Sequence, residues 1–322
     1  MGEFSLAAGS ALVLRTWPFL LLRAAVYFGI AAAFASAVAG GSGIGAGIGT
    51  LLGAAARAPG GFWGAIAGLA FIALLLWWLR EYLLYLVEVG HAAAISLALD
   101  QVKTPGLQGS IVAAMSAVQR KFRDASVLTT ADRYARGTID DLLRSVDVLS
   151  ALLPTSFELP RNITDRALRV PLGCVARTVL ARTVAGKARN PYSDLRDNLI
   201  LLAQNHDILF RNAILLAAGS YVVCFFVFLL SLIPAFAVTR AFPGGSGLIA
   251  LALAGAFTWS FQRALIEPVV TASFLELFRR VTRGQTPEPD WDMRLEEIAE
   301  SYGEVKAIAA PAPRNPRRGI VA

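Results

Sequence analysis

The chain has 322 residues, of which 56% are hydrophobic and 16% are charged, and its net charge is +7. Soluble domains carry about 25% charged and about 45–50% apolar residues. Its mean hydropathy of +0.56 means more apolar surface than a soluble fold can bury, which excludes an ordinary soluble enzyme, a disordered chain and a fibrous protein. The composition predicts an all-α polytopic integral membrane protein.

Four apolar segments are long enough to cross a bilayer as helices, which requires about 20 residues. In chain order they cover residues 17–39, Phe62–Leu79, Asn212–Thr239 and Ala241–Gln262. A glycine-rich apolar segment, residues 40–56, follows the first span, and a re-entrant loop is one alternative for it. The spans form two predicted hairpins, within residues 1–101 and 209–283.

Lys and Arg concentrate outside these hairpins. Residues 102–211 contain sixteen Lys and Arg and ten Asp and Glu. Residues 279–322 contain eight Lys and Arg and seven Asp and Glu. Positively charged loops stay on the cytoplasmic side, so we expect a multi-pass protein of the cell membrane with both termini in the cytoplasm. Since topology accounts for the basic residues, no nucleic-acid partner is expected.

Residues 102–208 are too polar to span a bilayer but have helical periodicity. The predicted amphipathic helices cover Leu107–Leu128, Thr130–Leu153, Thr164–Lys187 and a segment after Asn190-Pro191. We expect them to lie along the cytoplasmic interface, where anionic headgroups attract Lys and Arg, or to pack beneath the spans. Residues 284–322 are predicted to be a flexible cytoplasmic tail with one short helix, about Asp290–Ala307.

Metal-ligating residue types are scarce. The two cysteines, Cys174 and Cys224, and the two histidines, His91 and His206, are far apart in the chain. Zinc sites and disulfide frameworks need several clustered or paired ligands, so no metal site and no cofactor are expected. No nucleophile–base or phosphate-loop motif is present, so an enzyme is not expected.

Two patterns bear on helix packing. Gly41, Gly45, Gly49 and Gly53 recur at four-residue spacing, which favours close helix packing over phosphate binding. A Pro-Gly-Gly motif also opens both the second and the fourth span, and in each case two arginines lie 23 residues apart: Arg57 and Arg80, then Arg240 and Arg263. This favours either a parallel repeat of two hairpins, as in many transporters, or two similar turns.

Ionisable residues beside the second span form one candidate site, because charges there are costly and usually face a partner or a cavity. Glu81, Glu88 and His91 fall on one helical face, with Tyr85 nearby. The alternative is that these side chains simply reach the headgroups at the cytoplasmic interface.

The fourth span holds the other candidate site. Arg263 and Glu267 are an i,i+4 pair, and Pro268 deprives the Ala264 carbonyl of its donor. Glu267 and this carbonyl are a candidate cation site with Arg263 as the resting counter-ion. A purely structural ion pair is the alternative interpretation.

Several landmarks occur in a characteristic order from Leu79 onwards. They are Arg80-Glu-Tyr-Leu-Leu-Tyr-Leu-Val-Glu-Val-Gly90, Gln119-Arg-Lys-Phe-Arg123, Arg189-Asn-Pro-Tyr192, Ala203-Gln-Asn-His-Asp-Ile-Leu-Phe-Arg-Asn-Ala213 and the closing helix Phe257–Arg279. In order and character, about 200 residues resemble the C-terminal membrane core of the choline transporter-like family, which implies a transport core. The chain departs from that family in its shorter length, fewer spans and lack of cysteine clusters.

The leading functional expectation is a transporter or permease-like protein for a small solute, with a cation as one candidate. Aromatic side chains can offer their faces to a quaternary ammonium or form an interfacial belt; the candidates are Trp77, Trp78, Tyr82, Tyr85 and Trp259. The alternative is a non-transporting membrane scaffold whose basic cytoplasmic helices bind anionic lipid or a partner protein. Four spans are few for one pathway, so a homodimer is also considered.

Overall fold

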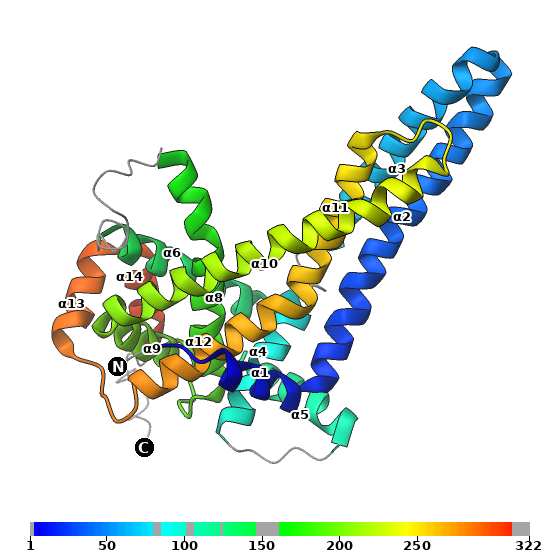
Figure 1. The fold of residues 1–322 in the computed structure, drawn as a ribbon. Coiled ribbons are helices and arrows are strands. Elements are labelled where there is room, and N and C mark those ends of the chain that lie inside the picture. Colours follow the sequence, from blue (N-terminus) through cyan, green and yellow to red (C-terminus); the bar gives the residue numbers. More distant parts are fainter. Residues whose placement is uncertain (1–2, 80–84, 101–105, 123–124, 146–160, 311–322) are drawn as a thin grey trace, which may run out of the picture.

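The structure is a computed structural model that describes residues 3–79, 85–100, 106–122, 125–145 and 161–310 (Figure 1). All regular elements in these ranges are helical. In chain order they are α1 (Leu6–Arg15), α2 (Trp17–Leu52), η1 (Ala54–Ala56), α3 (Arg57–Leu79), α4 (Tyr85–Leu99), α5 (Gly106–Lys121), α6 (Ala125–Ser145), α8 (Arg161–Ala185), α9 (Pro191–Gln204), α10 (His206–Arg240), α11 (Gly247–Phe261), η3 (Gln262–Ile266, a π-helical turn), α12 (Glu267–Val281), α13 (Pro289–Ile298) and α14 (Glu300–Ala309).

The chain forms a long stalk and a helical body (Figure 1). The stalk consists of two antiparallel hairpins, α2–α3 and α10–α11, and both hairpin turns point away from the body. In the described ranges, four helical segments are long and apolar enough to cross a membrane: Trp17–Leu52, Ala54–Trp78, His206–Arg240 and Gly247–Val281. The predicted all-α membrane protein with four spans is therefore confirmed.

The first hairpin differs from its prediction, because α2 runs as one helix through the glycine-rich residues 40–52. The turn is confined to residues 53–56, where Gly53 has a φ of 127° that only glycine adopts readily. Two features suggested a break after residue 39. One is the Gly-Gly-Ser-Gly run at residues 40–43; the other is apolar length, since 36 residues span about 54 Å, well beyond a hydrocarbon core of about 30 Å.

Backbone contact between α2 and α3 explains why the helix persists. A Cβ atom on Gly45 would lie 2.1 Å from the Gly60 carbonyl oxygen, and one on Gly41 would lie 2.2 Å from that of Gly64. Gly49 meets Ala56 in the same way, at 2.3 Å. These glycines therefore permit the close packing of the hairpin. Gly53, the fourth member of the predicted stripe, lies in the turn.

The two Pro-Gly-Gly motifs occupy different positions. Residues 59–61 lie inside α3, whereas residues 243–245 form the turn between α10 and α11. The two motifs nevertheless meet, because Ser42 Oγ donates to the Pro243 carbonyl at 2.6 Å and a Cβ on Gly61 would lie 2.2 Å from that oxygen. The motifs thus hold one hairpin against the other and do not mark equivalent repeat positions.

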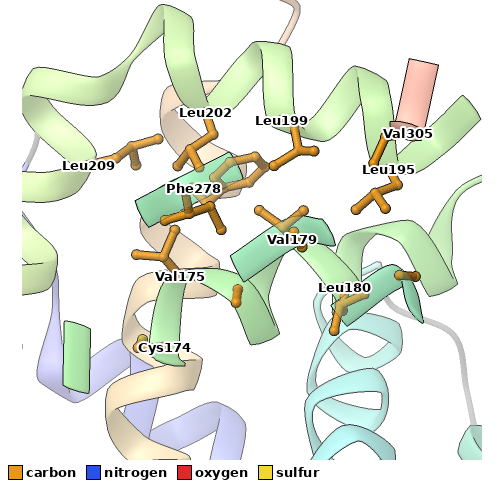
Figure 2. Packing of buried hydrophobic residues seen from close by; sticks show 14 of the residues in the cluster. Cys174, Val175, Val179, Leu180, Leu195, Leu199, Leu202, Leu209, Phe278 and Val305 are labelled. Atoms are coloured by element: carbon orange, nitrogen blue, oxygen red, sulfur yellow. The ribbon is translucent and has the colours of Figure 1, made fainter. Parts of the chain in front are cut away.

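The body contains α1, α4, α5, α6, α8, α9 and α12 to α14, and its core lies mainly between α8, α9 and α12 (Figure 2). Val179, Leu195, Leu199 and Phe278 are all fully buried there. The described parts of the predicted amphipathic helices of residues 102–208 therefore pack into one core in the body. Their boundaries shift, however: α5 ends at Lys121 and α6 begins at Ala125.

The predicted short helix, about Asp290–Ala307, is divided into two packed helices within residues 289–309, and residues 311–322 of the predicted flexible tail lie outside the described residues. The two helices, α13 and α14, turn at Ala299 and bury Leu295, Tyr302 and Val305 completely. A second addition is α1, which the sequence does not predict. It buries Leu12 and Val13 in a cluster shared with α4 and α12.

Candidate functional site: a buried ionic cluster at the base of the stalk

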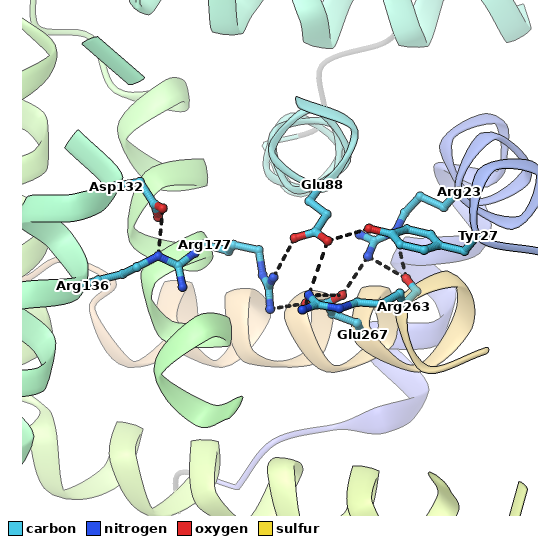
Figure 3. Close-up of polar contacts among 8 residues, drawn as sticks. All are labelled: Arg23, Tyr27, Glu88, Asp132, Arg136, Arg177, Arg263 and Glu267. Atoms are coloured by element: carbon cyan, nitrogen blue, oxygen red, sulfur yellow. Dashed lines mark hydrogen bonds and ion pairs between the residues drawn. The ribbon is translucent and has the colours of Figure 1, made fainter. Parts of the chain in front are cut away.

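Six polar side chains from five helical segments meet where the stalk joins the body (Figure 3). They are Arg23 and Tyr27 of α2, Glu88 of α4, Arg177 of α8, Arg263 of η3 and Glu267 of α12. We call this set the ionic cluster. It joins residues that are up to 244 positions apart in the chain.

Glu267 is at the centre of the ionic cluster. Its carboxylate lies 3.0 Å from Nη2 of Arg23 and 2.8 Å from Nη1 of Arg263, and it also contacts Nη2 of Arg177. Three guanidinium groups therefore share one carboxylate. Charge-assisted bonds of this kind are the strongest hydrogen bonds available to side chains.

Glu88 is the second acid of the cluster. Its Oε2 atom accepts from Nη1 of Arg177 at 3.0 Å, and its Oε1 atom accepts from the Tyr27 hydroxyl at 2.6 Å. Nη1 of Arg263 lies 3.3 Å from the same Oε1 atom. Arg177 and Arg263 thus each bridge both carboxylates and join the two acids in one network.

A break in the fourth span supplies a backbone acceptor. Within η3, the Glu267 N–H bonds the Gln262 carbonyl, five residues earlier, so the next donor in this register would be Pro268, which has no N–H. The carbonyl left over is that of Arg263, and Arg23 donates to it from Nη2 at 2.6 Å and from Nε at 3.1 Å. The sequence predicts a free carbonyl on Ala264; the carbonyl that Arg23 contacts belongs to the preceding residue, Arg263.

The ionic cluster is not electrically balanced, because it contains three arginines and two glutamates. The side chains of Arg23, Arg177, Glu267 and Glu88 are 3%, 9%, 11% and 14% exposed, whereas that of Arg263 is 34% exposed. Burial opposes the charge of Arg177, but Glu267 and Glu88 raise its pKa above the ordinary value. Among the three arginines, Arg263 is the most accessible carrier of the positive charge.

His91 lies outside the ionic cluster. Its Nε2 atom is 3.1 Å from Thr16 Oγ1, and its ring stacks on Phe19 at 5.6 Å. Burial, with a smaller contribution from Arg23, lowers the pKa of His91 well below its usual value. His91 is therefore neutral at physiological pH and links α4 to the α1–α2 junction.

The aromatic candidates lie in different parts of the structure. Trp259 packs edge-on against Tyr27, with ring centroids 5.6 Å apart, so it lines the ionic cluster. Trp77 and Trp78 are exposed on α3. Tyr85 begins α4, but its side chain lies outside the description, and Glu81 and Tyr82 fall outside the described residues.

Three cluster residues were not among the sequence-derived candidates: Arg23, Tyr27 and Arg177. Arg23 carried a usable signal, because it is the one charged residue within the first predicted span, and Tyr27 follows it by one helical turn. Arg177 carried none, since it is one of four arginines spread along a segment of ordinary amphipathic appearance.

No protein-family model, curated protein or solved structure that was compared with the chain matches it. The resemblance to the choline transporter-like family is thus carried by the sequence landmarks alone. What the fold itself defines is an all-α polytopic membrane protein. Within the described ranges, no group of three or more His, Cys, Asp or Glu side chains is arranged to hold a metal ion.

Proposed function

We propose that the protein is a membrane transporter for a small solute and that the ionic cluster binds the solute and gates its passage. The main support is the charge imbalance of the cluster at a π-helical, proline-containing break in the fourth span. Broken spans are where transporters build binding sites, and π-helical turns often mark functional sites. Both hairpins contribute to the cluster, so relative movement of the hairpins would alter it.

The geometry favours a solute with an anionic group over the cation considered from the sequence. A cation at Glu267 would have to displace at least one of three arginines. A carboxylate or phosphate at Arg263 would instead neutralise the excess charge. Moreover, Arg263 can leave the cluster without stranding either acid, because Arg23, Arg177 and Tyr27 still hold both.

The proposed orientation places the body in the cytoplasm, since residues 102–211 and 279–322 carry most of the Lys and Arg. In this orientation the ionic cluster lies at the cytoplasmic end of the stalk. Exposed apolar side chains on the stalk, such as Phe225, Phe226 and Ile233 of α10, would then face lipid.

The experiment is uptake of labelled anionic, neutral and cationic solutes into proteoliposomes that contain the purified protein. We expect uptake of an anionic solute, and loss of that uptake in Arg263→Gln without loss of folding, because the remaining cluster has two positive and two negative charges. Arg240→Gln is the matched control. Arg240 is the last residue of α10, next to the hairpin turn, and this variant should transport normally.

Wild-type uptake by a well-folded Arg263→Gln variant would exclude the binding role of Arg263. Uptake of cations alone would reject the anionic class. If correctly folded wild-type protein moves no solute, the transporter proposal fails and the membrane-scaffold alternative is favoured.

A further inference from the structure

The body contains a pocket of about 990 Å³ that shares no residue with the ionic cluster. It lies between the end of α5, the connection from α8 to α9, and the end of α14, and Arg120, Arg189 and Tyr192 are among its lining residues. Its volume is at the upper end of the range of small-molecule sites. A ligand in this pocket would therefore not contact the residues on which the transport proposal depends.

Among the described residues that line this pocket, the charged ones are all basic: Arg120, Lys121 and Arg189. Lys121 is fully engaged, since it pairs with Asp194 and donates to the Gly186 and Ala188 carbonyls at 3.2 and 2.8 Å. Arg120 and Arg189 are exposed and make no hydrogen bond or ion pair with another described residue. The lining therefore includes two exposed guanidinium groups that no described residue engages.

The pocket is preorganised by contacts behind its lining. Asp194 accepts from the Ala188 backbone N–H at 3.1 Å, which together with Lys121 fixes the connection from α8 to α9. Asn190 Nδ2 also donates to the Ile308 carbonyl at 2.9 Å, which joins this connection to the end of α14. A ligand would therefore spend little binding energy on ordering the walls.

The rest of the lining is largely apolar. Leu97, Ala117, Val127 and Val184 come from four different helices and contribute only hydrocarbon. An apolar floor with two exposed arginines suits a molecule that has one anionic end and one apolar end. Arginine forks match the oxygens of phosphate in pairs, so a phosphate group fits the charged end.

We propose that this pocket binds a phosphate monoester with an apolar substituent, with Arg120 and Arg189 on the phosphate and the apolar part on the floor. The same chemistry is found in a soluble phosphorylated metabolite and in an anionic lipid such as phosphatidic acid. The two sources differ in whether the ligand arrives from water or from the bilayer.

The test uses calorimetric titration of the full-length protein in phosphatidylcholine nanodiscs with hexyl phosphate. Hexyltrimethylammonium is the charge-reversed control ligand. We expect hexyl phosphate to bind and to bind at least about tenfold more weakly to Arg120→Gln/Arg189→Gln, because a hydrogen bond to a charged group contributes that much. Arg133→Gln/Arg211→Gln, which removes two exposed arginines elsewhere, should bind as the wild type does.

Repeating the titration in nanodiscs that contain phosphatidic acid identifies the source. Loss of hexyl phosphate binding there indicates that the lipid occupies the pocket, and unchanged binding indicates a soluble ligand. The proposal is overturned if hexyl phosphate does not bind in phosphatidylcholine, if the two double variants bind equally, or if hexyltrimethylammonium binds as well.

Discussion

Replacement of Glu267 by glutamine should be the most destabilising single change of charge in the ionic cluster. It leaves three arginines with Glu88 as their only acid, so the excess rises from one positive charge to two. Removing one partner of a buried ion pair costs about 3–5 kcal/mol. We expect the free energy of unfolding of Glu267→Gln to fall by about that amount.

Arg263→Gln should behave differently, although it breaks the same 2.8 Å contact. Both acids keep buried partners, the remaining charges balance, and the lost arginine is one-third exposed. A partly solvated ion pair contributes about 1 kcal/mol or less, so the two variants should differ by about 2–4 kcal/mol. The Arg263→Gln/Glu267→Gln double variant restores the wild-type excess of one charge and should lie between them.

The assay is equilibrium unfolding in mixed micelles, followed by tryptophan fluorescence, to which Trp259 contributes from beside Tyr27. Glu276→Gln on the same helix is the matched control, because the ion pair that Glu276 makes within the described residues is long, at 3.9 Å to Arg280. Equal destabilisation by Glu267→Gln and Arg263→Gln would refute the charge-imbalance argument. So would a Glu267→Gln variant as stable as the control.

Three further predictions concern other parts of the chain. Gly45→Val should force the first hairpin apart and cost about 1–3 kcal/mol, as overpacking does, whereas Gly43→Val, whose Cβ has no neighbour within 4 Å, should be tolerated; thermal unfolding compares them. Burial opposes the charge of Asp292, but the Tyr302 hydroxyl, Lys306 and Arg196 lower its pKa below 3.8. Because the pKa of Asp292 is lower in the folded state, its stabilisation is present above pH 3.8 and is lost as pH falls through the folded pKa. Limited proteolysis should therefore release α13 and α14 in acid. Asp292→Asn should remove this pH dependence. In intact cells with the native cysteines replaced, Ala241→Cys should react with an impermeant thiol reagent and Thr129→Cys should not; labelling at Thr129 would reverse the proposed orientation.

Local sequence signals predicted the elements that depend on local properties. Hydropathy over about 20 residues located the four spans, and Asn190-Pro191 marked the start of α9, where Asn190 caps the Tyr192 N–H at 3.0 Å. The Arg263–Glu267 pair was visible because its members lie one helical turn apart on one helix.

Features that depend on distant contacts were not predictable in the same way. Residues 40–52 remain helical because α3 lies against their glycines, and a single helix shows no sign of such a neighbour. Arg23 and Glu267 meet across 244 residues, and no local pattern encodes that distance. The tail residues 289–309 have ordinary polarity, and their burial depends on the surface that α6 and α9 offer.

The π-helical turn before α12 sets the rotational phase of everything that follows it. A π turn accommodates about one residue more than an α turn, and one residue corresponds to about 100° of rotation around a helix. The face of α12 that carries Phe274 and Phe278 into the core is therefore aimed by residues 262–266. Deleting one residue from this turn would make the fourth span a continuous α-helix and swing both phenylalanines out of register with α8 and α9, so the stalk cannot be straightened here without unpacking the body.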